Sequence, residues 1–267
     1  MRAPSIFSFG FAYYLLLALF LYLPIVLLII FSFNDSTLLV FPFKGFTLKW
    51  YQSLSNAREL LDAVRNSILV GLFSSFVAVI FGTMAALAIA RFNFPGRSFF
   101  LAISSLPLVI PYVVLGVAML LLFAQVGVEL SLFTVAAAHT VINIPYVMLI
   151  VAARLAGFEQ NLEEAAMDLG ATYWGMLMRV TLPISAPALI AAFLSSFTTS
   201  FDEFALAFFL TGTDNTLPVY LYSQLRFPNR LPLVVTLAAI IMLVSVILIV
   251  FSEWLRRVGT KDVPRTS

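Results

Sequence analysis

Long, nearly uninterrupted apolar stretches dominate the chain, and shorter polar segments separate them. Six stretches are long and apolar throughout: 11–33, 64–90, 99–123, 132–152, 187–210 and 233–255. A helix needs about 20 such residues to cross roughly 30 Å of hydrocarbon, and lipid offers no partner to unpaired backbone groups. Barrel strands would alternate apolar and polar residues, which these stretches do not. The pattern therefore predicts an all-α membrane protein with six transmembrane helices, forming one domain over 1–267.

The composition supports this class and removes several others. Hydrophobic residues make up 62% of the chain and charged residues 10%, and the mean hydropathy is +1.04. These values exclude a soluble globular protein and a disordered chain. The net charge of +2 is too small to indicate a nucleic-acid partner. Because the chain has no Cys and a single His, His139, disulfides and thiolate metal sites are excluded, and we expect no metal site.

The basic residues predict how the spans are oriented. Six spans place both termini on one side, and short basic loops stay in the cytoplasm. The short connection 91–97 and the C-terminal tail 256–265 are both rich in arginine and lysine. We therefore predict a multi-pass membrane protein with both termini in the cytoplasm. The first stretch is too long for a signal-peptide core and lacks a following cleavage site, so it is predicted to remain as a span.

The cytoplasmic connection 153–186 is long and helical in pattern. Glu163-Glu164 suits the first turn of a helix, and Gly170 is a typical C-terminal stop. Thr172 can cap a second short helix, which Leu182-Pro183 is predicted to end.

Two kinds of side chain in this connection indicate a docking surface for another protein. Ala165 and Ala166 are small enough for a partner to approach closely, and Tyr173 and Trp174 are large aromatics on a water-facing loop. Exposed aromatics of this kind often anchor interfaces. The alternative is an amphipathic helix that lies along the membrane surface.

Three elements of the connection stand in register. Glu164-Ala165-Ala166 is followed after three residues by Gly170, and after nine more by Val180-x-Leu182-Pro183. This register resembles the "EAA" signature of the membrane subunits of ABC importers, with Val180 where isoleucine is usual. Four other segments are similar to the second permease subunit of spermidine/putrescine importers, namely 66–67, 91–97, 200–203 and 211–218. The resemblance thus extends over nearly the whole chain.

The resemblance implies the type I ABC importer permease fold, in which the loop helix docks into a cleft of an ATP-hydrolysing subunit. It implies ATPase-coupling roles for Glu164, Ala165, Ala166 and Gly170. The other coupling candidates in the same connection are Asp168, Tyr173, Trp174, Leu182 and Pro183. The resemblance also implies a location in the lipid bilayer of the bacterial inner membrane and three protein partners. These are a second, homologous permease chain that completes a heterodimer, a dimer of ATP-binding subunits and an extracytoplasmic solute-binding protein.

The chain itself is not predicted to be an enzyme. A Gly-Lys dipeptide is absent, so the phosphate-binding loop of ATPases is absent too. ATP and Mg²⁺ are therefore expected on the partner ATPase subunit, and no cofactor is expected on this chain.

Polar residues in the predicted fifth span mark a candidate translocation path. Charged groups inside a span are costly and are functional candidates by default, which singles out Asp202 and Glu203. Ser195, Thr198 and Asp202 repeat at helical spacing, and Ser196, Thr199 and Glu203 follow one position later. The two carboxylates differ by about 100° around a helix, so we expect only Asp202 to face the path squarely. The alternative is that a carboxylate satisfies a neighbouring helix or reaches outside water.

The predicted fourth span holds a second polar pair. His139 and Asn143 lie four residues apart, just before Pro145, and so share a face. They are candidates for the substrate path, although a buried hydrogen-bonded pair beside a proline kink is the favoured interpretation. In the third span, Pro107 and Pro111 are expected to bend the helix.

The predicted function is import of a small organic cation, a polyamine such as spermidine or putrescine, by alternating access. Another small solute is an alternative, since a solute-binding protein largely sets specificity. A secondary transporter or channel could use the same carboxylates, but it needs no docking signature. An intramembrane serine hydrolase would have only Ser98 and His139 as raw material.

Overall fold

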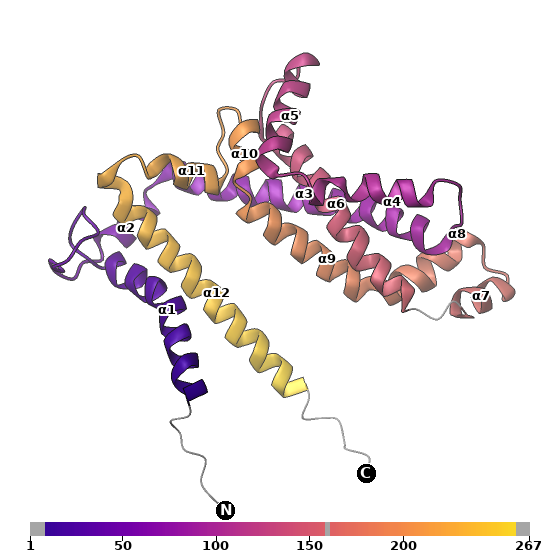
Figure 1. Ribbon diagram of the computed structural model, residues 1–267, viewed down its shortest axis with the longest axis horizontal. Helices are drawn as coiled ribbons and strands as arrows, with labels where there is room; N and C mark the ends of the chain where they lie inside the picture. The colour runs from indigo at the N-terminus through magenta and orange to yellow at the C-terminus, as the bar shows by residue number, and fades with distance from the viewer. Residues whose placement is uncertain (1–8, 158–160, 260–267) are drawn as a thin grey trace, which may run out of the picture. The chain divides into compact units, whose positions relative to one another are not determined.

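A computed structural model describes residues 9–157 and 161–259, which form helices joined by short connections (Figure 1). Within these residues there is no β-strand, only an isolated backbone bridge between Asn34 and Phe46. The all-α prediction is therefore confirmed for this part of the chain. Of the basic residues in the tail, Lys261 and Arg265 lie outside the described residues. The chain divides into two compact units, Met1–Arg58 with Leu221–Ser267, and Glu59–Tyr220.

The first unit is built from the two ends of the chain. Helix α1 (Phe9–Ser32) packs against α12 (Leu231–Gly259), and the short α2 (Lys49–Ser55) also packs against α12. The Tyr51 hydroxyl lies 2.7 Å from Ser32 Oγ, and Thr236 Oγ1 donates to the Pro232 carbonyl at 2.7 Å. The side chains of α1 remain exposed on most sides, including Leu16 and Phe20, as a lipid-facing helix requires.

The second unit contains a bundle of three long helices, α3 (Arg58–Arg91), α6 (Leu132–Ala156) and α9 (Leu182–Asp202). Ala78 and Ala86 of α3, Val147 and Met148 of α6 and Ala192 of α9 form its buried core. Gly82 stands between the two alanines, and a Cβ added there would lie 2.6 Å from Val147 Cβ. The stripe of small residues thus lets α3 cross α6 at close range, as is usual for membrane helices.

A second core forms where α5 (Tyr112–Gln125) and α10 (Ala205–Leu210) pack together beside the first half of α6. Gly116 allows the approach, because a Cβ there would lie 3.0 Å from the Phe209 ring. Val135 and Leu206 are fully buried in this core.

The start of α3 is tied to the segment before α11 (Leu217–Gln224). The Asn66 side-chain amide donates to the Asn215 carbonyl at 3.1 Å, and the Leu217 N–H donates to Ser67 Oγ at 2.8 Å. The Asn-Ser pair at 66–67, part of the family resemblance, therefore has a structural role at the first turns of α3. Beyond α11, a 3₁₀ turn, η3 (Pro228–Arg230), leads into α12.

The predicted third span, 99–123, is not one helix. It consists of α4 (Arg97–Ser105), a 3₁₀ turn η1 (Leu106–Leu108) and α5, and the two apolar halves are bent by 101°. Pro107 and Pro111 cause the break, since neither can donate a backbone hydrogen bond and Pro111 caps the start of α5. The prolines were expected to bend the helix, but they interrupt it.

The predicted fifth span, 187–210, is wrong at both ends. Leu182-Pro183 does not end the preceding helix, because α8 (Tyr173–Met176) continues through a π-helical turn η2 (Leu177–Thr181) into α9. A widened turn is a common way for a helix to absorb a local irregularity, here the proline that lacks an N–H. At the other end α9 stops at Asp202, because Glu203 takes an extended backbone conformation.

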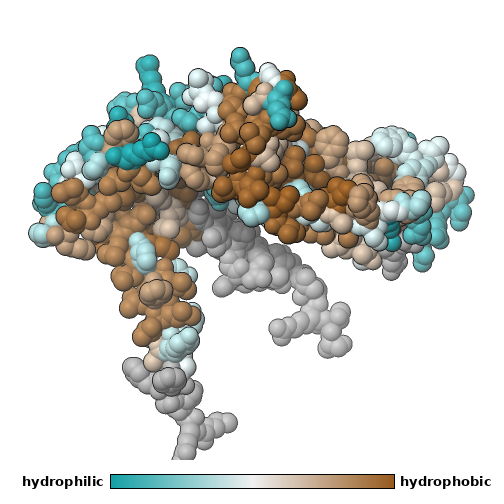
Figure 2. All heavy atoms as spheres, turned by 45° about the horizontal axis from the view of Figure 1, so that its top comes forward, coloured by the Kyte–Doolittle hydropathy of each residue, from teal (hydrophilic) through white to brown (hydrophobic). Residues whose placement is uncertain are grey.

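Four helices are long and apolar enough to cross a membrane: Gly10–Ser32, Arg58–Arg91, Leu132–Ala156 and Tyr173–Asp202. The count is five if the bent pair of α4 and α5 forms one span, and the described apolar part of α12 is shorter than these. Hydrophobic residues also cover much of the visible surface rather than lying only inside (Figure 2). The structure thus supports four or five spans in the described residues, against six predicted.

Candidate coupling surface and translocation path

The loop helix α7 (Asn161–Asp168) ends where the sequence predicts. Gly170 has φ +90°, its N–H donates to the Met167 carbonyl at 2.8 Å, and the Ala171 N–H donates to the Ala166 carbonyl at 3.1 Å. These bonds form a Schellman cap, which strongly favours glycine at the left-handed position. The next cap is confirmed as well, since Thr172 Oγ1 accepts from the Gly175 N–H at 3.1 Å and opens α8.

Most of the predicted coupling residues form an exposed surface at this end of the second unit. Glu164, Ala165, Asp168, Gly170 and Trp174 are exposed, while Ala166 is half-buried. Tyr173 is exposed too, but its ring packs edge-on against Phe92 with centroids 6.1 Å apart. Leu182 and Pro183 are set apart from this surface in the chain, beyond the π-helical turn.

Sequence reasoning missed the apolar side chains of the same surface. Leu169 is 90% exposed, and Leu162 and Met167 are also exposed on or next to α7. A short helix in a soluble loop would normally turn such residues inward. The only sequence feature that pointed to their exposure is their position beside the alanine pair. These exposed side chains add an apolar component to the candidate docking surface.

One residue of α7 points the other way. The carboxylate of Glu163 is buried and accepts from Arg91 Nε at 2.8 Å and from Arg91 Nη2 at 3.3 Å. Thr181 Oγ1, in the π-helical turn, donates to the same carboxylate at 2.7 Å. Arg91 Nη1 also donates to the Leu155 carbonyl of α6 at 3.3 Å. One carboxylate therefore joins α7 to the end of α3 and to the start of the long helix that contains α9.

The two polar stripes of α9 have different surroundings. Ser195, Thr198 and Asp202 are exposed, and no hydrogen bond or ion pair of Asp202 occurs among the described residues. In the stripe one position later, Ser196 and Glu203 are buried and Thr199 is half-buried. The predicted path residues are thus divided between an open face and the interior of the bundle.

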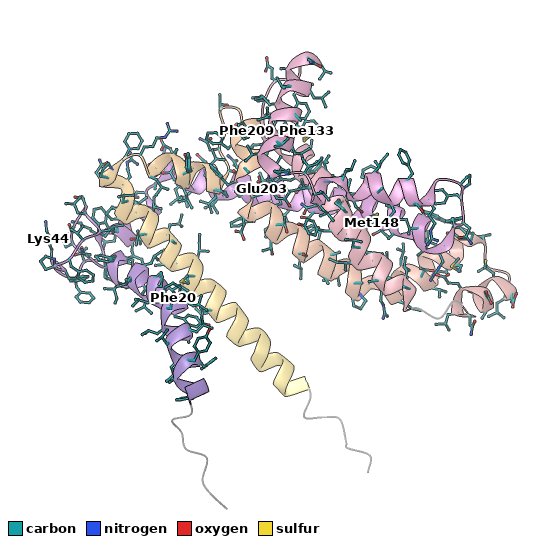
Figure 3. The ribbon with its side chains drawn as sticks, in the orientation of Figure 1. Phe20, Lys44, Phe133, Met148, Glu203 and Phe209 are labelled. Atoms are coloured by element: carbon teal, nitrogen blue, oxygen red, sulfur yellow. The ribbon has the colours of Figure 1, made fainter. Side chains whose placement is uncertain are left out.

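Glu203 sits at the junction of α9 and α10 and holds that junction together (Figure 3). Its carboxylate accepts from the Leu206 N–H at 2.9 Å and from the Ala207 N–H at 3.1 Å, so it satisfies the first turn of α10. His139 Nε2 lies 3.2 Å from the same carboxylate. This is the alternative that the sequence left open, a carboxylate that satisfies neighbouring helices.

His139 belongs to a buried polar cluster between helices. Its Nδ1 lies 2.6 Å from Ser200 Oγ, and Ser74 Oγ of α3 lies 3.1 Å from the same hydroxyl. Asn143, one turn further along α6, is fully buried, and its side-chain amide has no hydrogen-bond partner among the described residues. The structure therefore brings His139 and Glu203 together, but leaves Asp202 and Ser195 exposed on α9. Within the described residues no group of three or more His, Asp or Glu could hold a metal ion.

Long apolar helices, broken spans and an exposed loop helix that carries the EAA register define a membrane component of a transport system. Residues 78–258 match the family described as the inner membrane component of binding-protein-dependent transport systems, and the chain belongs to this family.

Several known proteins resemble the chain over most of its length. It is 34% identical over 243 residues, 91% of each chain, to the spermidine/putrescine transport system permease protein PotC of Escherichia coli (strain K12). It is 35% identical over 215 residues to the putrescine transport system permease protein PotI of the same strain, covering 78% of this chain and 76% of that one. The fold is similar to a chain of a bacterial ABC transporter involved in the import of the acidic polysaccharide alginate. That comparison has a TM-score of 0.72 at 19% identity, and covers 96% of this chain and 98% of the other.

Proposed function

We propose that the chain is the membrane-spanning permease subunit of an ATP-driven importer that carries a polyamine, spermidine or putrescine. The observation that carries the proposal is the likeness, over 91% of both chains, to a relative named as a spermidine/putrescine permease. Residues outside the matched family region add to it, since that likeness extends beyond the part of the chain shared by the family.

The proposal includes the architecture and the partners. The chain crosses the membrane six times, with both termini in the cytoplasm. In this arrangement the bent α4–α5 pair forms one crossing and α12 forms another, in addition to the four long apolar helices. A second, homologous permease chain completes the path, and a dimer of ATP-binding subunits, which hold ATP and Mg²⁺, docks on the surface around α7. A solute-binding protein delivers the polyamine from the other side. The chain itself binds no cofactor.

The open stripe of α9 is the proposed wall of the path. Asp202 is the last residue of α9, where the helix dipole disfavours a negative charge, so helix stability does not explain it. An exposed carboxylate beside Ser195 and Thr198 suits an ammonium group, which donates to oxygen acceptors. His139, Asn143 and Glu203 then support the path from behind, and Thr199 lies between the two sets.

Transport proceeds by alternating access. ATP binding closes the ATPase dimer, moves the docked α7 and opens the outer mouth, and hydrolysis restores the inward-open state. The solute shifts this equilibrium only through its different affinities for the two states.

Reconstitution of the complete transporter in proteoliposomes tests the proposal. We expect uptake of labelled spermidine or putrescine only with ATP and a polyamine-loaded binding protein. Uptake driven by an ion gradient, with this chain alone, would replace the proposal by a secondary transporter. ATP-dependent uptake of a different solute, with no polyamine uptake, would leave the importer role standing and overturn the substrate.

A further inference from the structure

We propose that Arg91 and Glu163 are positioning residues that transfer the movement of α7 to α3. The inference rests on the proposed function, because it assigns the route by which an ATP-driven movement enters the bundle. In this arrangement the ATPase subunit displaces α7, and the Arg91–Glu163 ion pair carries the displacement to the end of a helix distant in sequence.

The attachment of α7 to the rest of the unit is unusual for a helix. Glu163 is the only buried residue of α7, while Leu162 and Met167 are exposed. A helix of eight residues is also too short to be stable by itself in water. Its position therefore depends on the buried polar contact of Glu163 rather than on an apolar core.

The geometry of the ion pair suits the transfer of force. Arg91 contacts both carboxylate oxygens through Nε and Nη2, and its side chain is 11% exposed against 8% for Glu163. A forked arginine–carboxylate pair fixes orientation as well as distance, and burial protects it from screening by salt. A push or a twist of α7 therefore reaches Arg91 directly.

Arg91 passes the movement on to more than one helix. It is the last residue of α3, and it also bonds the Leu155 carbonyl in the last turn of α6. Further along, Gly82 locks α3 against Val147 of α6, so these two helices move together. Thr181 bonds the same Glu163 carboxylate from the turn that precedes α9. The three long helices of the bundle thus receive the movement of α7 at one point.

The test uses the complete transporter in proteoliposomes and measures uptake and ATP hydrolysis in the same preparation. The variants are Glu163→Gln, Arg91→Met and the exchanged pair Arg91→Glu/Glu163→Arg, with Arg97→Met as an exposed arginine control. We expect the single variants to keep the ATPase subunit bound but to transport about tenfold less solute per ATP, within the range of typical coupling free energies. The exchanged pair should recover part of this loss, and the control should not change.

Two results of this experiment would overturn the inference. One is a wild-type ratio of uptake to hydrolysis in Glu163→Gln, and another is loss of the ATPase subunit from that variant, which would assign Glu163 to docking alone. These are distinct from failure of the proposed function, in which the wild-type transporter itself shows no ATP-dependent uptake.

If the single variants fold poorly, a covalent cross-link in place of the Arg91–Glu163 ion pair tests the same inference. The chain has no cysteine, so in Arg91→Cys/Glu163→Cys a short bifunctional thiol reagent can join only these two positions of the chain. The joined protein should regain the solute-to-ATP ratio that the unjoined variant lacks. The third overturning result is a joined protein that stays as uncoupled as the unjoined one.

Discussion

At the scale of single residues, two adjacent carboxylates have opposite environments. Asp202 lies on the exposed face of α9 without a partner among the described residues, whereas Glu203 is buried against His139 and two backbone N–H groups. The difference arises because α9 ends between them. One side chain therefore remains exposed, and the other accepts hydrogen bonds from the first turn of α10.

The first prediction at this scale concerns Asp202. Asp202→Asn should lower polyamine uptake about fivefold at subsaturating solute, since an exposed charge pair contributes about 1 kcal/mol. Assembly with the partner subunits should be intact, as measured by co-purification. Vesicle uptake at wild-type level in the variant would remove Asp202 from the path.

The neighbouring variant Glu203→Gln serves as the comparison. It takes the charge from a buried acceptor of two N–H groups and leaves His139 without its carboxylate partner, which we expect to cost about 1–3 kcal/mol of stability. Its melting temperature in detergent should therefore fall below that of the wild-type protein. The melting temperature of Asp202→Asn should be unchanged. Equal melting temperatures for the two variants would contradict the different roles.

At the scale of elements, small residues decide how closely the long helices meet. Ala78, Gly82 and Ala86 line up along α3, and only Gly82 faces a contact that no side chain could enter, with the Ile144 carbonyl 2.9 Å from an added Cβ. Local features also interrupt two of the predicted spans. Pro107 and Pro111 break the third span, and the Glu203 carboxylate caps a new helix, α10, within the fifth.

The prediction for these elements is that Gly82→Leu separates α3 from α6. Overpacking of this kind destabilises a protein by about 1–3 kcal/mol, and more where backbone must move. Thermal melting in detergent measures the loss. Met84→Leu is the control, because Met84 lies on the exposed side of α3 two residues away and should leave the melting temperature unchanged. A stable Gly82→Leu variant would mean that α3 and α6 do not pack closely.

At the scale of the whole molecule, the chain belongs to a family of inner membrane components of binding-protein-dependent transport systems, and its exposed loop helix is the proposed contact with an ATPase subunit. Apolar and acidic side chains lie together on this surface, including Leu169 and Glu164. A surface of this kind, held by a buried ion pair behind it, suits docking better than a helix that lies along lipid, because the lipid-facing alternative requires a basic polar face.

The docking prediction follows from the cap and the surface. Gly170→Arg forces a side chain into a left-handed conformation, which costs about 1–2 kcal/mol, and Glu164→Lys reverses an exposed charge. Both variants should release the ATPase subunit in a pull-down from detergent. Glu129→Lys, an exposed charge reversal in the connection between α5 and α6, should retain it. An undisturbed complex in both docking variants would contradict the assignment of this surface.

The sequence by itself determined the helical class and the caps at Gly170 and Thr172, because apolar length and cap chemistry are local properties. Only the tertiary structure decided where the third and fifth spans break and which carboxylate is buried. It also paired Arg91 with Glu163, which lie 72 residues apart. A hydrogen bond between distant segments depends on how the helices pack against one another, and the spacing of residues along the chain does not determine this packing.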